Sequence, residues 1–198
     1  MAAIKPFSQA CANNCQPILT ILEPVFANTT KVLEIGSGTG QHAVFFAPAL
    51  SHLIWQPSDR SENIAGIHAW LEEYPADNLR SPLTLDVTGR WPTSTFDGFF
   101  TANTCHIMPW SAVVAMFEGI GRIAQQPATL VIYGPFKYGG KFTTASNAAF
   151  DGWLKSQAPH QGIRDSEAII RLAEDIGFNL EADNAMPANN QLLVFRGC

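Results

Sequence analysis

Residues 31–42 restrict the fold of this chain more than any other stretch. Residues 31–35 (K-V-L-E-I) have the apolar character of a buried strand, and three alternating glycines follow at once: Gly36, Gly38 and Gly40. Because glycine has no side chain, such a turn lets the backbone press against a ligand. The stretch therefore predicts a strand, a glycine turn and a helix with a ligand at the turn.

The size and composition of the chain indicate one globular domain. We expect residues 1–198 to share a single well-buried core. The chain has 46% hydrophobic and 15% charged residues, which is ordinary for a soluble protein, and no apolar run reaches the roughly 18 residues that span a bilayer. Residues 1–7 carry one positive charge, and no apolar segment of a secretory signal follows them. We therefore expect a cytoplasmic protein without a membrane partner.

The charge pattern argues against a nucleic-acid partner. The formal net charge is -5, the isoelectric point is near 5.4, and no run of lysine and arginine offers a basic footprint. The histidines have no spacing typical of a metal site, and the cysteines form no C-x-x-C pairs, so we expect no metal and free thiols at Cys11, Cys15, Cys105 and Cys198. A small molecule or a protein side chain is the expected substrate.

Short apolar runs alternate with segments of helical period, a pattern typical of an α/β fold. The expected strands are 31–35, 53–56, 83–87, 96–102, 128–134, 178–183 and 190–196. No helix separates the last two, which favours an antiparallel pair. The pattern predicts a doubly wound, mostly parallel sheet that ends in an antiparallel hairpin.

Helices are expected over 41–50, around Ile64, Ile67 and Leu71, and along the apolar face of Val113, Phe117, Ile120 and Ala124. In the last helix Asp165 caps the start and Gly177 gives a left-handed stop. Residues 133–142 contain four glycines or prolines and are expected to be irregular. This segment begins at the carboxyl end of a strand and is either a substrate loop or an ordinary surface loop.

Acidic and polar residues stand where the expected strands end, the edge at which open α/β sheets bind ligands. Asp59 follows the second strand, where its carboxylate can accept hydrogen bonds from both hydroxyls of a ribose. Alternatively, Asp59 is a surface residue that stabilises a turn. Asp86 can accept from the exocyclic amine of adenine or cap a helix. Glu34 is the lone acid of a buried strand and needs partners, either amides of the glycine turn or a ligand ammonium.

The turn separates two classes of nucleoside site. The dinucleotide fingerprint G-x-G-x-x-G needs a glycine or alanine at position 41, where this chain has Gln41. The turn instead resembles the first motif of class I S-adenosylmethionine-dependent methyltransferases, which share a Rossmann-like fold. An NAD-dependent reductase stays open as a less favoured alternative.

Further stretches resemble one methyltransferase-like family of unknown function found in bacteria and animals. The similarity runs nearly from end to end and is carried by Asn14, Pro17-Ile18-Leu19, residues 33–42, Trp55-Gln56-Pro57-Ser58-Asp59, Leu85-Asp86-Val87, Asn103, His106, Tyr133-Gly134-Pro135-Phe136, Gly140-Lys141, Ser146-Asn147, Phe150-Asp151, Gly162-Ile163-Arg164-Asp165 and Met186-Pro187-Ala188-Asn189-Asn190.

The resemblance implies S-adenosylmethionine as cofactor and a set of residues around it. The three glycines would line its methionine moiety, Asp59 its ribose and Asp86 its adenine, with Asn103 beside the sulfonium. Asn14, Glu34, His42 and Val87 belong to the same motifs and are carried over as cofactor-binding residues. The family has an arginine where this chain has Asn13, so a bidentate clamp on a carboxylate is replaced by a neutral amide.

The catalytic residues are less defined, because methyl transfer can be accelerated mainly by alignment of donor and acceptor. His106 is the first candidate for a base, or a histidine bonded within a loop, and Tyr133 is the second candidate. Tyr138, Asn189 and Asn190 are candidate substrate contacts. Four aromatic residues form either a wall against the sulfonium or parts of the core: Phe7, Trp110, Phe136 and Tyr138.

The sequence thus predicts an enzyme that transfers a methyl group from S-adenosylmethionine to a small molecule. The alternative is an inactive module that binds the same cofactor and acts through a protein partner, since the most clearly assigned residues hold a ligand. Exposed strand edges permit a homodimer without requiring one.

Overall fold

A computed structural model describes residues 5–197 of the chain. The start of the N-terminal segment discussed above and Cys198 lie outside the described residues. The main sheet has seven strands in the order β3-β2-β1-β4-β5-β10-β9. Their bounds are β1 (Lys31–Ile35), β2 (Ile54–Asp59), β3 (Leu83–Thr84), β4 (Phe96–Ala102), β5 (Ala124–Gly134), β9 (Phe178–Met186) and β10 (Asn190–Gly197).

The five strands of the β3-to-β5 half run parallel, whereas β10 is antiparallel to both β5 and β9. The predicted α/β class, the mostly parallel sheet and the closing hairpin are therefore confirmed. The order reverses between β1 and β4, since the chain first builds outward to β3 and then returns to the other side of β1. Ligands bind at such a switch point, beyond the carboxyl ends of the strands.

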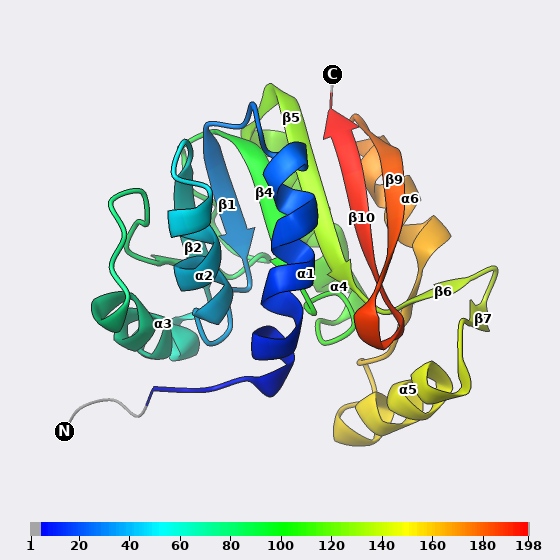
Figure 1. Cartoon of the computed structure of the whole chain (residues 1–198). Coiled ribbons are helices and arrows are strands. Elements are labelled where there is room, and N and C mark those ends of the chain that lie inside the picture. Colours follow the sequence, from blue (N-terminus) through cyan, green and yellow to red (C-terminus); the bar gives the residue numbers. More distant parts are fainter. Residues whose placement is uncertain (1–4, 198) are drawn as a thin grey trace.

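Helices cover both faces of this sheet (Figure 1). The helices α1 (Gln9–Val25) and α2 (Gln41–Ala49) pack on one face, and α4 (Trp110–Ile123) and α6 (Ser166–Asp175) pack on the other. The helix α3 (Ser61–Glu73) lies beside α2 near the β3 edge. The helix α5 (Ala145–Gln157) lies past the carboxyl ends of the parallel strands. Within residues 5–197 no helix is both long and apolar enough to cross a bilayer.

Alternating side chains of each central strand enter two separate cores. In β5, Val131 and Tyr133 pack toward α1 and α2, and Leu130 and Ile132 pack toward α4 and α6. A strand buried on both faces needs apolar residues at successive positions, which is why these strands read as continuous hydrophobic runs.

The segment predicted to be irregular is partly regular. Residues 133–142 hold the end of β5 and the hairpin of β6 (Phe136–Tyr138) and β7 (Lys141–Phe142), which joins β8 (Arg164–Asp165) in a second sheet of order β7-β6-β8. Gly139 and Gly140 form the hairpin turn with φ of +55° and +75°, a region that favours glycine. The glycines therefore mark a tight turn.

Several predicted element boundaries are wrong, among them the end of β2, which lies at Asp59 rather than at residue 56. The strand expected over 83–87 ends at Thr84, because the Asp86 carboxylate accepts hydrogen bonds from the main-chain amide and hydroxyl of Thr88 and turns the chain. Ala124, expected on a helix face, is already the first residue of β5.

The last helix begins and ends where the sequence predicts, but its cap differs. Asp165 holds the N-cap position without a side-chain capping bond. Its carboxylate instead accepts the Gly140 amide at 2.9 Å and lies 3.3 Å from Lys137 Nζ, which ties α6 to the β6–β7 hairpin. At the other end Gly177 has φ of +84°, so the predicted left-handed stop is confirmed.

Candidate functional site

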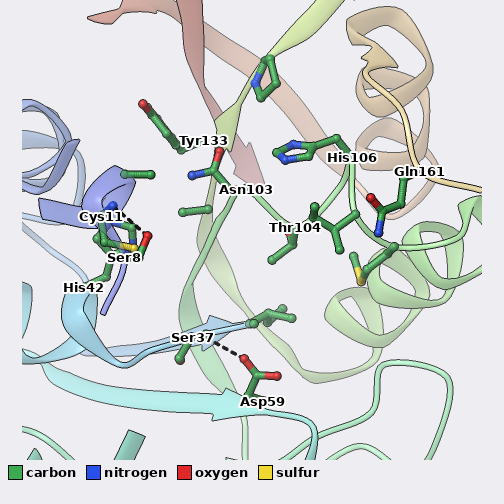
Figure 2. A pocket seen from close by; sticks show the side chains of 18 of the residues that line it. Ser8, Cys11, Ser37, His42, Asp59, Asn103, Thr104, His106, Tyr133 and Gln161 are labelled. Atoms are coloured by element: carbon green, nitrogen blue, oxygen red, sulfur yellow. Dashed lines mark hydrogen bonds between the residues drawn. The ribbon is translucent and has the colours of Figure 1, made fainter. Parts of the chain in front are cut away.

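A cavity of about 1350 Å³ opens at the carboxyl edge of the main sheet. The glycine turn, the end of β2, the turn after β3 and the residues after β4 line one part of it, and α1, α5 and the ends of β5 and β9 line the rest. Figure 2 shows side chains around one hollow that come from the N-terminal end of α1, the glycine turn, the end of β2, the residues after β4 and the end of β5. The cavity therefore collects residues from the whole length of the chain.

The three glycines of the turn are required for different reasons. A Cβ on Gly36 (φ +74°) would lie 2.5 Å from Thr104 Cγ2, and one on Gly40 (φ +89°) would lie 3.1 Å from Ile67 Cα. A Cβ on Gly38 (φ +57°) would meet nothing within 4 Å. The outer glycines allow close packing against the protein, whereas the middle one leaves open space at the cavity.

Asp59 fixes the shape of this turn. Its Oδ2 accepts a hydrogen bond from the main-chain amide of Gly38 at 2.6 Å. Its Oδ1 accepts one from the main-chain amide of Arg60 at 2.7 Å and one from Asn63 Nδ2 at 2.8 Å. The side chain lines the cavity and is largely buried. A carboxylate has about four acceptor positions, of which these bonds use three, so Asp59 can hold the turn and still accept one hydrogen bond from a ligand at Oδ2.

Asp86 and Val87 line the same part of the cavity, in the turn after β3. The Asp86 side chain is exposed, and hydrogen bonds from the side chain and amide of Thr88 lower the pKa of its carboxyl group. Asp86 is therefore an ionised acceptor near neutral pH, as an adenine amine would need.

Glu34 lies behind the turn rather than in the cavity. Its side chain is 1% exposed, and its Oε2 accepts the indole Nε1–H of Trp55 at 3.0 Å. Burial raises the pKa of the Glu34 carboxyl to about 7, although hydrogen bonds from Trp55 and Ser37 oppose the rise. Glu34 thus supports the turn from the α1 and α2 side of the sheet, and Gly40 also lies outside the cavity lining.

Asn14 and His42 form a buried pair at another wall of the cavity. His42 Nε2 lies 2.7 Å from Asn14 Oδ1, and the imidazole stacks on Phe46 with ring centroids 5.2 Å apart. Burial lowers the pKa of His42 to about 4, so the ring is neutral at pH 7. With Oδ1 as the acceptor, Nε2 carries the proton of this bond. Asn13 also lines this wall, where the amide of Gln9 donates to its Oδ1.

Asn103, His106 and Tyr133 line the cavity, and Figure 2 shows Asn103 between the other two, with the Tyr133 hydroxyl pointing away from His106. Asn103 has φ of +59°, an uncommon conformation for a residue other than glycine. Its main-chain N–H donates a hydrogen bond to the main-chain carbonyl of Tyr133 at 2.8 Å. Burial lowers the pKa of His106 to about 4 and raises the pKa of the Tyr133 hydroxyl. At neutral pH the site therefore presents an unprotonated imidazole and a protonated phenol.

Arg164 positions the loop that carries His106, a role the sequence did not reveal. Its Nε donates to the Cys105 carbonyl at 3.0 Å, and its Nη2 donates to the carbonyls of Met108 at 2.6 Å and His160 at 2.8 Å. The residue stood out only as part of a motif. Nothing local to residue 164 indicates carbonyl partners nearly 60 positions away.

The structure does not gather all predicted substrate residues. Asn190 lines the cavity, whereas Asn189 does not line it and its Nδ2 donates at 3.0 Å to Oγ of Ser146, a lining residue. The Tyr138 hydroxyl donates to Asp183 Oδ2 at 2.6 Å, also away from the cavity. The expected aromatic wall is not formed either. Phe136 is buried in the core, Phe7 is 63% exposed, and Trp110 lies near the Arg164 guanidinium.

Solved structures share this architecture. An O-methyltransferase family protein from Burkholderia thailandensis is 13% identical with a TM-score of 0.83, over 95% of this chain and 57% of that one. The mitomycin 7-O-methyltransferase MmcR is 16% identical with a TM-score of 0.82, and the match covers 96% of this chain and 54% of MmcR. Human N-acetylserotonin methyltransferase, solved in complex with S-adenosylmethionine, is 13% identical with a TM-score of 0.79. The match covers 96% of this chain and 53% of the human protein. The chain thus spans just over half the length of these proteins.

These comparisons define the fold as that of class I methyltransferases, as the glycine turn predicts. The chain itself belongs to the family described as "Protein of unknown function (DUF938)", whose sequence profile matches residues 5–197.

Proposed function

We propose that this protein transfers a methyl group from S-adenosylmethionine to a small molecule. The observation that carries the proposal is one cavity that joins the glycine turn and Asp59 to Asn103 and His106. Its volume of about 1350 Å³ exceeds the roughly 300–1,000 Å³ of ordinary ligand pockets, so a nucleoside donor and a second molecule fit together.

The residues at one end of the cavity fit the donor. The open space at Gly38 lets main-chain atoms approach the methionine moiety, near the neutral pair of Asn14 and His42. Asp59 would accept a hydrogen bond from one ribose hydroxyl at Oδ2, and Asp86 would accept one from the adenine amine beside Val87. The names of the structural neighbours, which are O-methyltransferases, also support a methyl donor here.

The residues at the centre would align the reacting groups. The donor supplies an activated methyl group on a positively charged sulfur. Asn103, held in its strained conformation by the Tyr133 carbonyl, presents a neutral amide at this point. The unprotonated His106 would accept a hydrogen bond from the acceptor and so orient its nucleophilic atom.

A second candidate is a binding module without turnover. Burial holds the pKa of His106 near 4, which makes it a weak base, and Asn13 replaces an arginine in the motif that this chain resembles. The same cavity would then hold S-adenosylmethionine or S-adenosylhomocysteine for a protein partner.

Turnover of the donor separates the two functions. The protein would be incubated with S-adenosylmethionine carrying a labelled methyl group and a small-molecule cell extract, and the products followed by mass spectrometry. An enzyme forms S-adenosylhomocysteine and labelled methylated products that are absent with Asp59→Ala. Binding of S-adenosylhomocysteine without any labelled product would favour the module.

A further inference from the structure

We propose that the acceptor is an uncharged aromatic molecule that carries a hydroxyl group. The inference rests on the proposed function, because it assigns the part of the same cavity that the donor would leave free. We call this part the acceptor chamber and define it by His106, Pro135, Phe150, Trp153 and Gln161, all of which line the cavity.

Permanent charge in the cavity is confined to the donor end. Among the described residues, the aspartate, glutamate, lysine and arginine side chains that line it are Asp59, Arg60, Glu62 and Asp86. All four belong to the end of β2, the start of α3 or the turn after β3, and Arg60 Nη2 pairs with Glu62 Oε1 at 2.7 Å. The acceptor chamber contributes none of them.

Other charges lie close to the chamber but are already engaged. The Arg164 guanidinium donates to three main-chain carbonyls beneath the His106 loop. On α5, Lys155 Nζ lies 2.6 Å from the buried Asp151 carboxylate, which also accepts the Ile163 amide at 2.8 Å. None of these three residues lines the cavity.

This distribution selects against charged acceptors. A carboxylate, phosphate or ammonium group in the chamber would lose water without gaining a partner of opposite charge. Removing a charge from water without such a partner is strongly unfavourable. An uncharged molecule avoids this cost.

The walls of the chamber favour a flat ring. Phe150 and Trp153 stack on α5, with ring centroids 5.7 Å apart and planes 13° apart, and Trp153 is 55% exposed, which extends the aromatic surface to the mouth. The Phe150 ring meets His106 edge to face at 5.5 Å. Aromatic pairs prefer such offset and edge-to-face contacts, so an aromatic ligand gains more here than an aliphatic one of equal area.

The polar groups of the chamber favour a hydroxyl. Neutral His106 accepts a hydrogen bond, and the Gln161 amide, which also lines the chamber, both donates and accepts. A ligand O–H can therefore donate to His106. In the reaction the hydroxyl oxygen bonds to the methyl carbon as the methyl–sulfur bond breaks. The proton passes to His106 and then to water, and the products are a methyl ether and S-adenosylhomocysteine.

Three probes with one ring system and different charges test the inference. 2-Naphthol, 2-naphthoate and 2-naphthylmethylammonium would be titrated at pH 7 into the protein saturated with S-adenosylhomocysteine, and binding followed by ligand-observed NMR. We expect 2-naphthol to bind at the chamber and both charged probes to bind at least tenfold more weakly. Equal or tighter binding of either charged probe, or no binding of 2-naphthol up to its solubility limit, would overturn the inference.

Two pairs of variants locate the effect. Gln161→Lys places a cation in the chamber and should make 2-naphthoate bind at least as tightly as 2-naphthol, whereas Gln157→Lys, at an exposed position of α5 outside the lining, should leave the preference unchanged. Phe150→Leu should weaken 2-naphthol at least fivefold, and Phe142→Leu, in β7, should not. Unchanged binding to both Gln161→Lys and Phe150→Leu would place the probe elsewhere and contradict the inference.

Failure of this inference is distinguishable from failure of the proposed function. Binding of S-adenosylhomocysteine is measured first and without probes, and it tests the donor end alone. If that ligand binds and 2-naphthol does not, the donor site stands and the acceptor class is wrong. If it does not bind, the proposed function fails, and the three probes titrated into the free protein still decide the charge preference.

Discussion

The Oδ2 atom of Asp59 accepts a hydrogen bond from the main-chain amide of Gly38 at 2.6 Å. This bond joins the carboxyl end of β2 to the middle of the glycine turn after β1, so the two parts of the proposed nucleoside site are directly connected. The carboxylate assigned to the ribose therefore also sets the shape of the turn assigned to the methionine moiety.

Asp59→Ala should weaken binding of S-adenosylhomocysteine by about 1–3 kcal/mol, because the turn loses its tie and the ribose its acceptor. Isothermal titration calorimetry measures the change. Glu174→Gln, an exposed carboxylate of α6, is the control and should bind as the original protein does. An unchanged dissociation constant for Asp59→Ala would refute the role of this residue.

Gly36→Ala should destabilise the protein more than Gly38→Ala. Both variants put a side chain at positive φ, which costs about 1 kcal/mol, but only the Gly36 variant also forces Cβ against Thr104. Urea unfolding gives the two free energies. Gly38→Ala should instead lose affinity for S-adenosylhomocysteine, since its Cβ occupies open space at the turn. Equal loss of stability in the two variants would show that Thr104 moves away freely.

Glu34→Gln should gain stability relative to the original protein as the pH rises from about 4.5 to about 7. The folded-state pKa of Glu34 is raised to about 7 by burial, so the unfolded chain loses its proton first and stability falls across this window. Glutamine has no such proton. The difference should reach at most a few kcal/mol, since one pKa unit is worth about 1.4 kcal/mol. Urea unfolding at pH 4.5 and pH 8 measures it, and a difference independent of pH would contradict the account.

Arg164→Lys should loosen the loop that carries His106. A lysine ammonium cannot reproduce the forked geometry that binds the carbonyls of Cys105, Met108 and His160 together. Amide hydrogen exchange of residues 104–108 should become at least tenfold faster, with exchange in β1 unchanged. Arg171→Lys, at an exposed position of α6, is the matched control. Unaltered exchange in the loop would show that other contacts hold it.

The sequence predicted the parts of the fold that follow from local pattern. Strands buried on both faces appear as continuous apolar runs, and the unseparated runs at the carboxyl end predicted the hairpin of β9 and β10. The helix α1 was missed because Pro17 and Pro24 lie within it and interrupt its apolar period. The small sheet was missed because β6, β7 and β8 have two or three residues each, too few for a periodic signal.

The candidate site likewise has a part that the sequence predicted and a part that it could not. Asp59 and the glycines were found because strand ends and glycine spacing are visible in the chain, and the structure places Asp59 and Gly38 in contact. The positions of Tyr138 and Asn189 outside the cavity depend on tertiary partners, Asp183 and Ser146, that lie 45 and 43 residues away in sequence. No local pattern encodes such pairs.

Calorimetric titration with S-adenosylhomocysteine, with NADH as the comparison ligand, tests the central claim most directly. The glycine turn, Asp59 and Asp86 should bind one molecule of S-adenosylhomocysteine per chain with a dissociation constant below about 100 μM, a free energy of roughly -5.5 kcal/mol, and NADH should give no saturable heat at the same concentrations. Absence of heat with S-adenosylhomocysteine at high micromolar concentration, or tighter binding of NADH, would contradict the account.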